Sequence, residues 1–305
     1  MKLMNLFNSS SYKSDKELSH YEGELGIFDY DPDEFEISRD HLHYCGKGTS
    51  VNLPKGCTNT SCMFANCKLP EGFTLGDKFD TSKVIDMYGM FASCKLPEGF
   101  TLGENFNTSK VTNMDSMFEN CKLPERFTLG ENFDTSKVTH MRSMFKNCRL
   151  PEGFTLGDNF DTSKVTDMWN MFGECILPEG FTLGDKFDTG RVINMGCMFR
   201  NCVLPEGFTL EEKFDTGRVT NMWGMFEGCK LPEGFTLGDM FDTSKVTNMD
   251  SMFAYCKLPE EFMLGKNFET DNVTDMNGMF WGCELPYTIT ANCNDTIEVI
   301  KQLSD

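Results

Sequence analysis

The chain has 305 residues, with 47 acidic and 28 basic side chains and a formal net charge of −19 at pH 7. This acidic balance excludes nucleic acids and anionic membrane surfaces as partners, because their phosphates would be repelled. The length fits one elongated domain, since a repeat array grows by adding units and is not limited by the size of a single globular core.

Residues 1–20 are predicted to be a flexible tail. Their apolar residues Leu3, Met4, Leu6 and Phe7 form a run too short for the core of a signal peptide or for a membrane span. We therefore expect neither a signal peptide nor insertion into a membrane.

Residues 21–66 are predicted to form an N-terminal β cap that ends in a degenerate first repeat. Residues 26–30 and 34–37 flank Asp31-Pro32-Asp33, which predicts a hairpin turn, and residues 42–45 are a candidate third strand. A cap is needed because the open end of a stack exposes strand edges and core side chains.

A unit of 27 residues begins at Cys67, and eight such units fill residues 67–282 without insertion or deletion. We call each set of equivalent positions in successive units a column and name it after its residue in the first unit. A fixed period of this kind predicts a solenoid in which the units stack on one another.

Nine columns are apolar in every unit, and they are predicted to form the core. A residue that packs against its own copy above and below can hardly vary, because protein interiors are close-packed. In the first unit these residues are Cys67, Leu69, Phe73, Leu75, Phe79, Val84, Met87, Met90 and Phe91.

The spacing of these residues predicts a mainly β path for each unit. Phe73-Thr74-Leu75 alternates between core and solvent, as expected of a short strand in parallel pairing with its neighbours, and residues 84–87 are a second candidate. Met87, Met90, Phe91 and Cys94 follow at helix-like spacing, which predicts a short helical turn at one corner.

The string VTxMxxMFxxC, which runs here from Val111 to Cys121, resembles the BspA-like repeats of bacterial surface proteins, including those of mycoplasmas. These repeats are relatives of leucine-rich repeats, and the resemblance spans residues 53–285. It implies a right-handed, leucine-rich-repeat-like parallel β-solenoid that binds proteins or host surfaces and has no shared catalytic residues. The unit is longer and more uniform than the usual pattern of that family.

Residues 283–305 are predicted to form a C-terminal cap with a short helix. Asn294 or Asp295 would cap the N-terminus of this helix, and Ile297, Ile300 and Leu303 would share one side of it. The solenoid would then be capped at both ends.

The 14 cysteines and four histidines give no metal or catalytic motif. Nine cysteines form a ladder of equivalent positions, which favours buried free thiols over disulfides, and Cys57 and Cys62 lack the partners of a zinc site. Free thiols favour a reducing compartment such as the cytoplasm, whereas the resemblance suggests the cell surface, so the location stays open. We expect no enzyme activity and no cofactor.

Acidic and threonine columns raise two further possibilities. The Asp80 column is acidic in seven of eight units and the Glu71 column in all eight, with basic columns at Lys68 and Lys83 close by. This predicts solvated ion-pair faces, and we do not expect calcium, because the glycine-rich nonapeptide of calcium-binding β-helices is absent. The Thr81 column and two others leave a structural or ice-binding solenoid as the alternative function.

Function is expected on the variable columns, because these face solvent if the invariant ones form the core. Exposed aromatic residues are enriched at protein interfaces, and Ile176 and Val203 interrupt the otherwise basic Lys68 column. The predicted edge for a protein partner is centred on Trp169, Ile176, Val203 and Trp223. The full set of candidate residues is Tyr88, Arg142, Trp169, Ile176, Val203, Trp223 and Trp281. The chain is thus predicted to be a non-enzymatic protein-binding scaffold.

Overall fold

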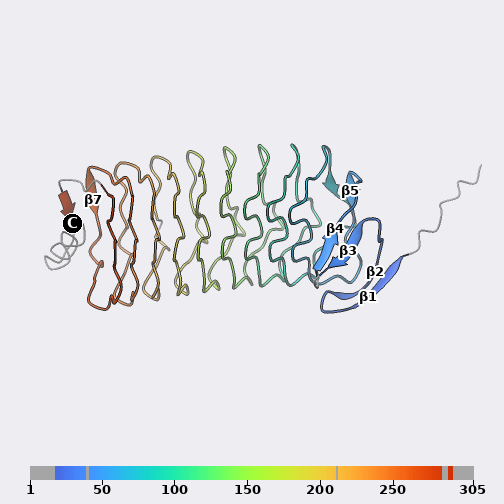
Figure 1. The fold of residues 1–305 in the computed structure, drawn as a ribbon, viewed down its shortest axis with the longest axis horizontal. Helices are drawn as coiled ribbons and strands as arrows, with labels where there is room; N and C mark the ends of the chain where they lie inside the picture. The colour runs from blue at the N-terminus through green and yellow to red at the C-terminus, as the bar shows by residue number, and fades with distance from the viewer. Residues whose placement is uncertain (1–17, 39–40, 211, 284–287, 291–305) are drawn as a thin grey trace, which may run out of the picture.

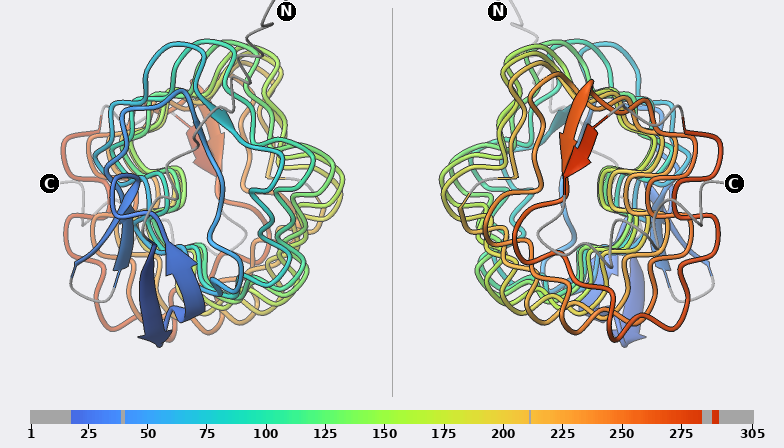
Figure 2. Two further views of the ribbon diagram at one scale, coloured as in Figure 1. Left: turned by 90° about the vertical axis from the view of Figure 1, so that its right-hand side faces the viewer. Right: turned by 90° about the vertical axis from the view of Figure 1, so that its left-hand side faces the viewer.

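The computed structural model describes residues 18–38, 41–210, 212–283 and 288–290. The 27-residue units lie one behind another along a single axis (Figure 1). Seen along that axis, successive units follow similar outlines (Figure 2). The prediction of tandem repeats that lie against one another is therefore confirmed.

The described residues contain no helix, and their strands are few and short. Four two-stranded sheets are formed, of which β1–β2 and β3–β4 are antiparallel and β5–β6 and β7–β8 are parallel. The strands are β1 (Ser19–Gly23), β2 (Gly26–Tyr30), β3 (Phe35–Ser38), β4 (His41–Tyr44), β5 (Ser50–Val51), β6 (Thr74–Leu75), β7 (Glu261–Met263) and β8 (Thr288–Thr290).

The N-terminal strands pair differently from the prediction. Strand β2 pairs with β1, and β3 pairs with β4, so Asp31-Pro32-Asp33 joins two hairpins and does not form the turn of one. The carbonyl of Asp31 accepts hydrogen bonds from the N–H groups of Glu34 and Phe35, which closes a tight connection. Strand β1 begins at Ser19, inside the segment predicted to be a tail. Residues 1–17 of that tail and the predicted C-terminal helix lie outside the described residues.

Most successive units are joined by single parallel bridges, where two strands per unit were predicted. The strand predicted at residues 73–75 forms only toward the ends of the array, as β6 paired with β5 and as β7 paired with β8. One series runs through the Lys68 column and another through the residues that precede Met87 in each unit. At the second series, Ile85 N–H donates to Thr58 of the preceding unit, whereas Met87 N–H donates to Asn113 of the following unit. The hydrogen bonds change direction within three residues, so pairing does not extend into a ladder.

Consecutive turns replace the predicted helical turn at residues 168–175. Three N–H groups each donate to the carbonyl three positions earlier, at 3.0 to 3.2 Å, namely those of Met171, Gly173 and Cys175. Asn170 and Glu174 have φ angles of 59° and 62°, and a left-handed residue at every fourth position interrupts a right-handed helix. Apolar side chains still reach the core at the spacing that had suggested a helix.

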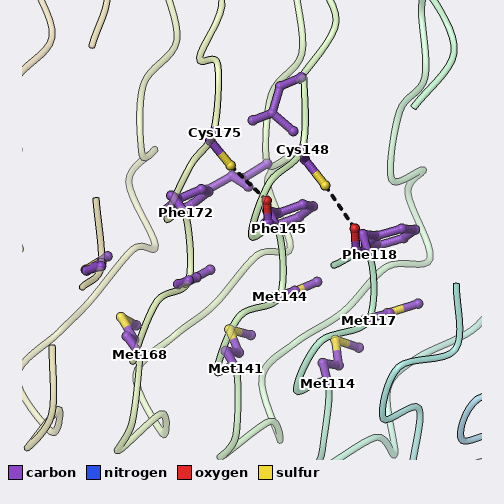
Figure 3. Packing of buried hydrophobic residues seen from close by; sticks show 14 of the residues in the cluster. Met114, Met117, Phe118, Met141, Met144, Phe145, Cys148, Met168, Phe172 and Cys175 are labelled. Atoms are coloured by element: carbon purple, nitrogen blue, oxygen red, sulfur yellow. Dashed lines mark hydrogen bonds between the residues drawn. The ribbon is translucent and has the colours of Figure 1, made fainter. Parts of the chain in front are cut away.

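The core consists of columns of identical side chains, as the invariant positions predicted. Phe118 and Phe145 stack with ring centroids 5.7 Å apart and planes 5° apart, and the methionine columns lie beside them (Figure 3). The Cys148 thiol donates to the carbonyl of Phe118 at 2.9 Å, and the equivalent thiols repeat this bond. Five buried thiols, from Cys148 to Cys256, therefore each have a backbone acceptor 30 residues earlier in the chain.

The Thr81 column is also part of the core. The hydroxyl of Thr81 is fully buried and donates to the carbonyl of Asn107 in the next unit at 2.8 Å, and six further units repeat this arrangement. One of the three threonine columns considered for ice binding is therefore not on the surface.

Candidate functional site

The turns at residues 168–175 position the first indole of the predicted edge. The Asp167 carboxylate accepts the N–H of Trp169 at 2.9 Å in an Asx turn, and the N–H of Asn170 donates to Gly196 of the next unit at 2.8 Å. Trp169 is therefore held between a side-chain cap and a backbone bond, with its side chain half-buried.

Gly196 follows Trp169 in the same column and makes room for its ring. A Cβ atom at Gly196 would lie 2.9 Å from Cδ1 of Trp169, closer than Cβ atoms come to carbon in real proteins. The indole of one unit thus covers the backbone of the next unit.

Trp223 stands one unit beyond Gly196 in the same column, and a charged pair lies against it. The guanidinium carbon of Arg200 is 6.0 Å from the centroid of the Trp223 ring, and the same guanidinium pairs with Glu227 at 2.8 Å. A cation placed over an indole face is weakly attracted by the ring. Arg200 and Glu227 were not among the predicted site residues, although opposite charges in one column, 27 residues apart, are visible in the sequence.

Arg142 lies in the same column one unit before Trp169 and is also paired. Its guanidinium donates to Asp167 at 2.7 Å, which holds the pKa of Arg142 above its ordinary value through that hydrogen bond. Its backbone N–H donates to Asp115 of the preceding unit, because His140 occupies the position where other units have an Asx-turn side chain. Burial raises the pKa of the Asp115 carboxyl, and the hydrogen bond from the Arg142 N–H opposes that rise.

Ile176 and Val203 form a separate apolar pair. They are joined by a parallel bridge, and about half of each side chain is exposed, at 50% and 48%. Arg149 and Lys230 stand before and after them in the same column. Among the described residues, no hydrogen bond or ring contact joins this pair to the two indoles, so the structure brings the predicted edge together as two pairs.

The two remaining candidates lie toward opposite ends of the array. Tyr88 is 43% exposed in the column of the indoles, and burial of its remaining part is the main reason that its pKa is raised. Trp281 is 64% exposed, and its ring centroid is 5.7 Å from that of Tyr255. Tyr255 was missed because it replaces a small residue at a left-handed turn position, which gives no sign in the sequence of an aromatic contact.

The comparisons with known proteins place this repeat in a family. The model of a family described as Mycoplasma protein of unknown function, DUF285, matches residues 58–175, 152–231 and 206–285. The chain belongs to the DUF285 family. No curated protein and no solved structure matches it. The match confirms a repeat family of Mycoplasma type, and the BspA-like relationship stays a proposal.

The acidic Asp80 column of this DUF285 protein caps turns. The Asp80 carboxylate accepts the N–H of Ser82 at 2.9 Å, and the equivalent bond recurs in six further units, including the one where Asn107 replaces the acid. Within the described ranges, no group of three or more histidine, cysteine or acidic side chains is placed to hold a metal ion. The ion-pair explanation of this column therefore missed its main structural role.

The fully buried thiols of the DUF285 repeats are poor nucleophiles in the folded chain. The 13 cysteines in the described part of the chain are free, and burial raises the pKa of Cys148 and of Cys202 to about 12. A thiol reacts as its thiolate, so these residues are protected in the native state. The described residues also contain no helix able to cross a membrane.

Proposed function

We propose that this DUF285 chain is a non-enzymatic protein-binding scaffold, working as a surface or host-interaction factor of BspA-like kind. Its architecture would be a right-handed, leucine-rich-repeat-like parallel β-solenoid, capped at both ends. The parallel bridges between equivalent residues and the stacking of the units support this architecture. Such arrays present long, regular surfaces that bind proteins.

The observation that carries the proposal is the contrast between constant core columns and one variable outer column. Phe and Met columns are fully buried in unit after unit, whereas the Tyr88 column changes at each step. Two of its members are the half-buried indoles of Trp169 and Trp223, and rigid aromatic side chains dominate binding energy at protein interfaces. The constant columns build the stack, and the variable column gives it a specific surface.

The test is capture of a partner from an extract of the native host by the immobilised full chain. Replacing Trp169 and Trp223 together by Ser is expected to abolish capture, while the unfolding midpoint in urea stays close to that of the wild type. Tyr255→Ser, which removes an exposed aromatic side chain outside the candidate set, is the matched control and is expected to retain capture. A double variant that captures the same proteins as the wild type would remove this edge from the proposal.

A further inference from the structure

The cysteine ladder ends at Cys283, which differs from the ladder thiols before it. The seven members from Cys94 to Cys256 are buried, whereas Cys283 and the first member, Cys67, are only partly buried. No ladder cysteine follows Cys283 in the sequence. Small reagents in the solvent can therefore reach Cys283, but they cannot reach the thiols in the middle of the ladder.

The backbone holds Cys283 directly beside Cys256 of the preceding unit. The N–H of Tyr255 donates to the carbonyl of Trp281 at 2.6 Å, so the two segments lie side by side like neighbouring strands. Neighbouring strands are about 5 Å apart, and a disulfide joins Cα atoms that are about 4.4 to 6.8 Å apart. The separation of the two segments therefore suits a disulfide between these two cysteines.

The two side chains also interact with each other. The Cys256 thiol lies within hydrogen-bonding reach of the Cys283 sulfur, and this hydrogen bond holds the pKa of Cys283 below its ordinary value, against the effect of burial. Burial raises the pKa of Cys256, and it raises that of Cys67 to about 11. A thiol reacts as its thiolate. Cys283 therefore combines access from the solvent with an available thiolate, and Cys256 keeps its proton.

The lowered pKa distinguishes Cys283 from the other cysteines. Among the 13 cysteines of the described residues, the pKa is raised at every position except this one. A partly exposed thiol that ionises readily and lies next to a second cysteine is the arrangement typical of redox-sensing sites.

We propose that Cys283 and Cys256 form a reversible thiol–disulfide site, in which Cys283 reacts first with a low-molecular-weight disulfide and Cys256 resolves the product. The product is an intramolecular disulfide that ties the last ladder position to the unit before it. This inference is independent of the proposed protein-binding function, because it involves neither indole of the predicted edge.

The reaction exchanges one disulfide for another. The Cys283 thiolate attacks one sulfur of the small disulfide, whose S–S bond breaks, and half of that molecule leaves as a thiolate. Cys256 then loses its proton to water, and its thiolate attacks the Cys283 sulfur and expels the second half. Two protein thiols are thus oxidised by two electrons, and the small disulfide is reduced to two thiols.

The new disulfide is expected to be strained and easily reduced. Cys256 and Cys283 donate to the carbonyls of Phe226 and Phe253, each 30 residues earlier, so their side chains point the same way. Their Cβ atoms are then about as far apart as the segments, about 5 Å, whereas the Cβ atoms of a disulfide are about 3.8 Å apart. Strained disulfides are the labile ones, so an excess of a small thiol should reopen this bond.

The experiment treats the reduced full chain with oxidised glutathione, blocks the remaining thiols under denaturing conditions and maps the products by mass spectrometry. The expected product is a peptide pair that joins Cys256 to Cys283 and is separated by dithiothreitol. Cys256→Ala should instead accumulate glutathione on Cys283, and Cys283→Ser should give neither product. Cys67→Ser is the matched control, because Cys67 is the other partly buried ladder thiol, and it should be oxidised as the wild type is.

A measurement on the unaltered chain tests the first step without any substitution. Brief treatment of the native protein with iodoacetamide at neutral pH should label Cys283 at least about tenfold faster than Cys67, because a larger share of Cys283 is thiolate. Equal labelling of the two, or a chain in which glutathione oxidises no cysteine, would overturn the proposal. Glutathione that stays on Cys283 in the wild type, or a disulfide between other cysteines, would show that Cys256 does not resolve the product and would overturn it as well.

Discussion

At the scale of single residues, Gly196 shows how a missing side chain shapes the candidate site. It is the glycine over which the Trp169 ring lies, and it adopts no left-handed φ angle that would itself require glycine. The constraint on this position is therefore the neighbouring indole, not the backbone. A sequence shows that the residue is small, but it does not show which side chain fills the space.

Gly196→Ala is expected to displace the Trp169 ring without unfolding the chain. The new Cβ would clash only with a side chain, and the lower entropy of the unfolded state offsets part of the strain, so stability should change by less than about 1 kcal/mol. Tryptophan emission should therefore shift. Gly190→Ser, which restores the residue found at the Ser82 position of other units, is the control. Unchanged emission in Gly196→Ala would contradict the placement of the ring.

At the scale of the structural element, the Asx turn explains the Asp80 column, for which the charge alone suggested ion pairing. Seven acidic residues at regular spacing predicted solvated ion pairs, yet the carboxylate of Asp80 accepts the N–H of Ser82. Asn107 makes the same bond without a charge, which was the one indication in the sequence that hydrogen bonding matters more than charge here.

Asp80 is expected to contribute to stability in a pH-dependent way. Hydrogen bonds from Ser82 hold its pKa below the ordinary value, so its contribution is full above about pH 4 and is lost as the pH falls through the folded pKa. Asp80→Asn should keep the turn and remove this dependence, whereas Asp80→Ala should cost about 1 kcal/mol at neutral pH. Urea unfolding at pH 7 and pH 3 would measure both. Equal acid sensitivity in the wild type and Asp80→Asn would contradict the assignment.

At the scale of the whole molecule, the repeat period and the core could be predicted from the sequence, but the backbone between core residues could not. The columns of Phe73, Val84 and Met90 are buried as their constancy predicted. The predicted helical turn was wrong, and the strand predicted at residues 73–75 forms only toward the ends of the array, as β6 and β7. Side-chain spacing reports which residues face inward and not which carbonyl each N–H bonds. The approach of the Trp169 ring to Gly196 of the next unit was likewise beyond the sequence, because it depends on the orientation of the Trp169 side chain.

The thiol ladder is expected to make the whole stack sensitive to alkali. Burial raises the pKa of the Cys94, Cys121, Cys175, Cys229 and Cys256 thiols as well as those of Cys148 and Cys202. Above about pH 9 the unfolded chain loses these protons while the folded chain keeps them, so the free energy of unfolding should fall by about 1.4 kcal/mol per pH unit for each thiol.

The measurement is the slope of the unfolding free energy against pH, obtained from urea titrations at several pH values between 8.5 and 10.5. This range begins at the ordinary thiol pKa of about 8.5. Replacing Cys148 and Cys175 together by Ala lowers the stability at every pH because cavities form, but it should also make the slope shallower by about 2.8 kcal/mol per pH unit. The wild type and the double variant share all their other titratable groups, so the difference between their slopes reports on these two thiols. If the unfolding free energy changes equally steeply with pH in the wild type and in the double variant, these thiols do not stay protonated in the folded stack.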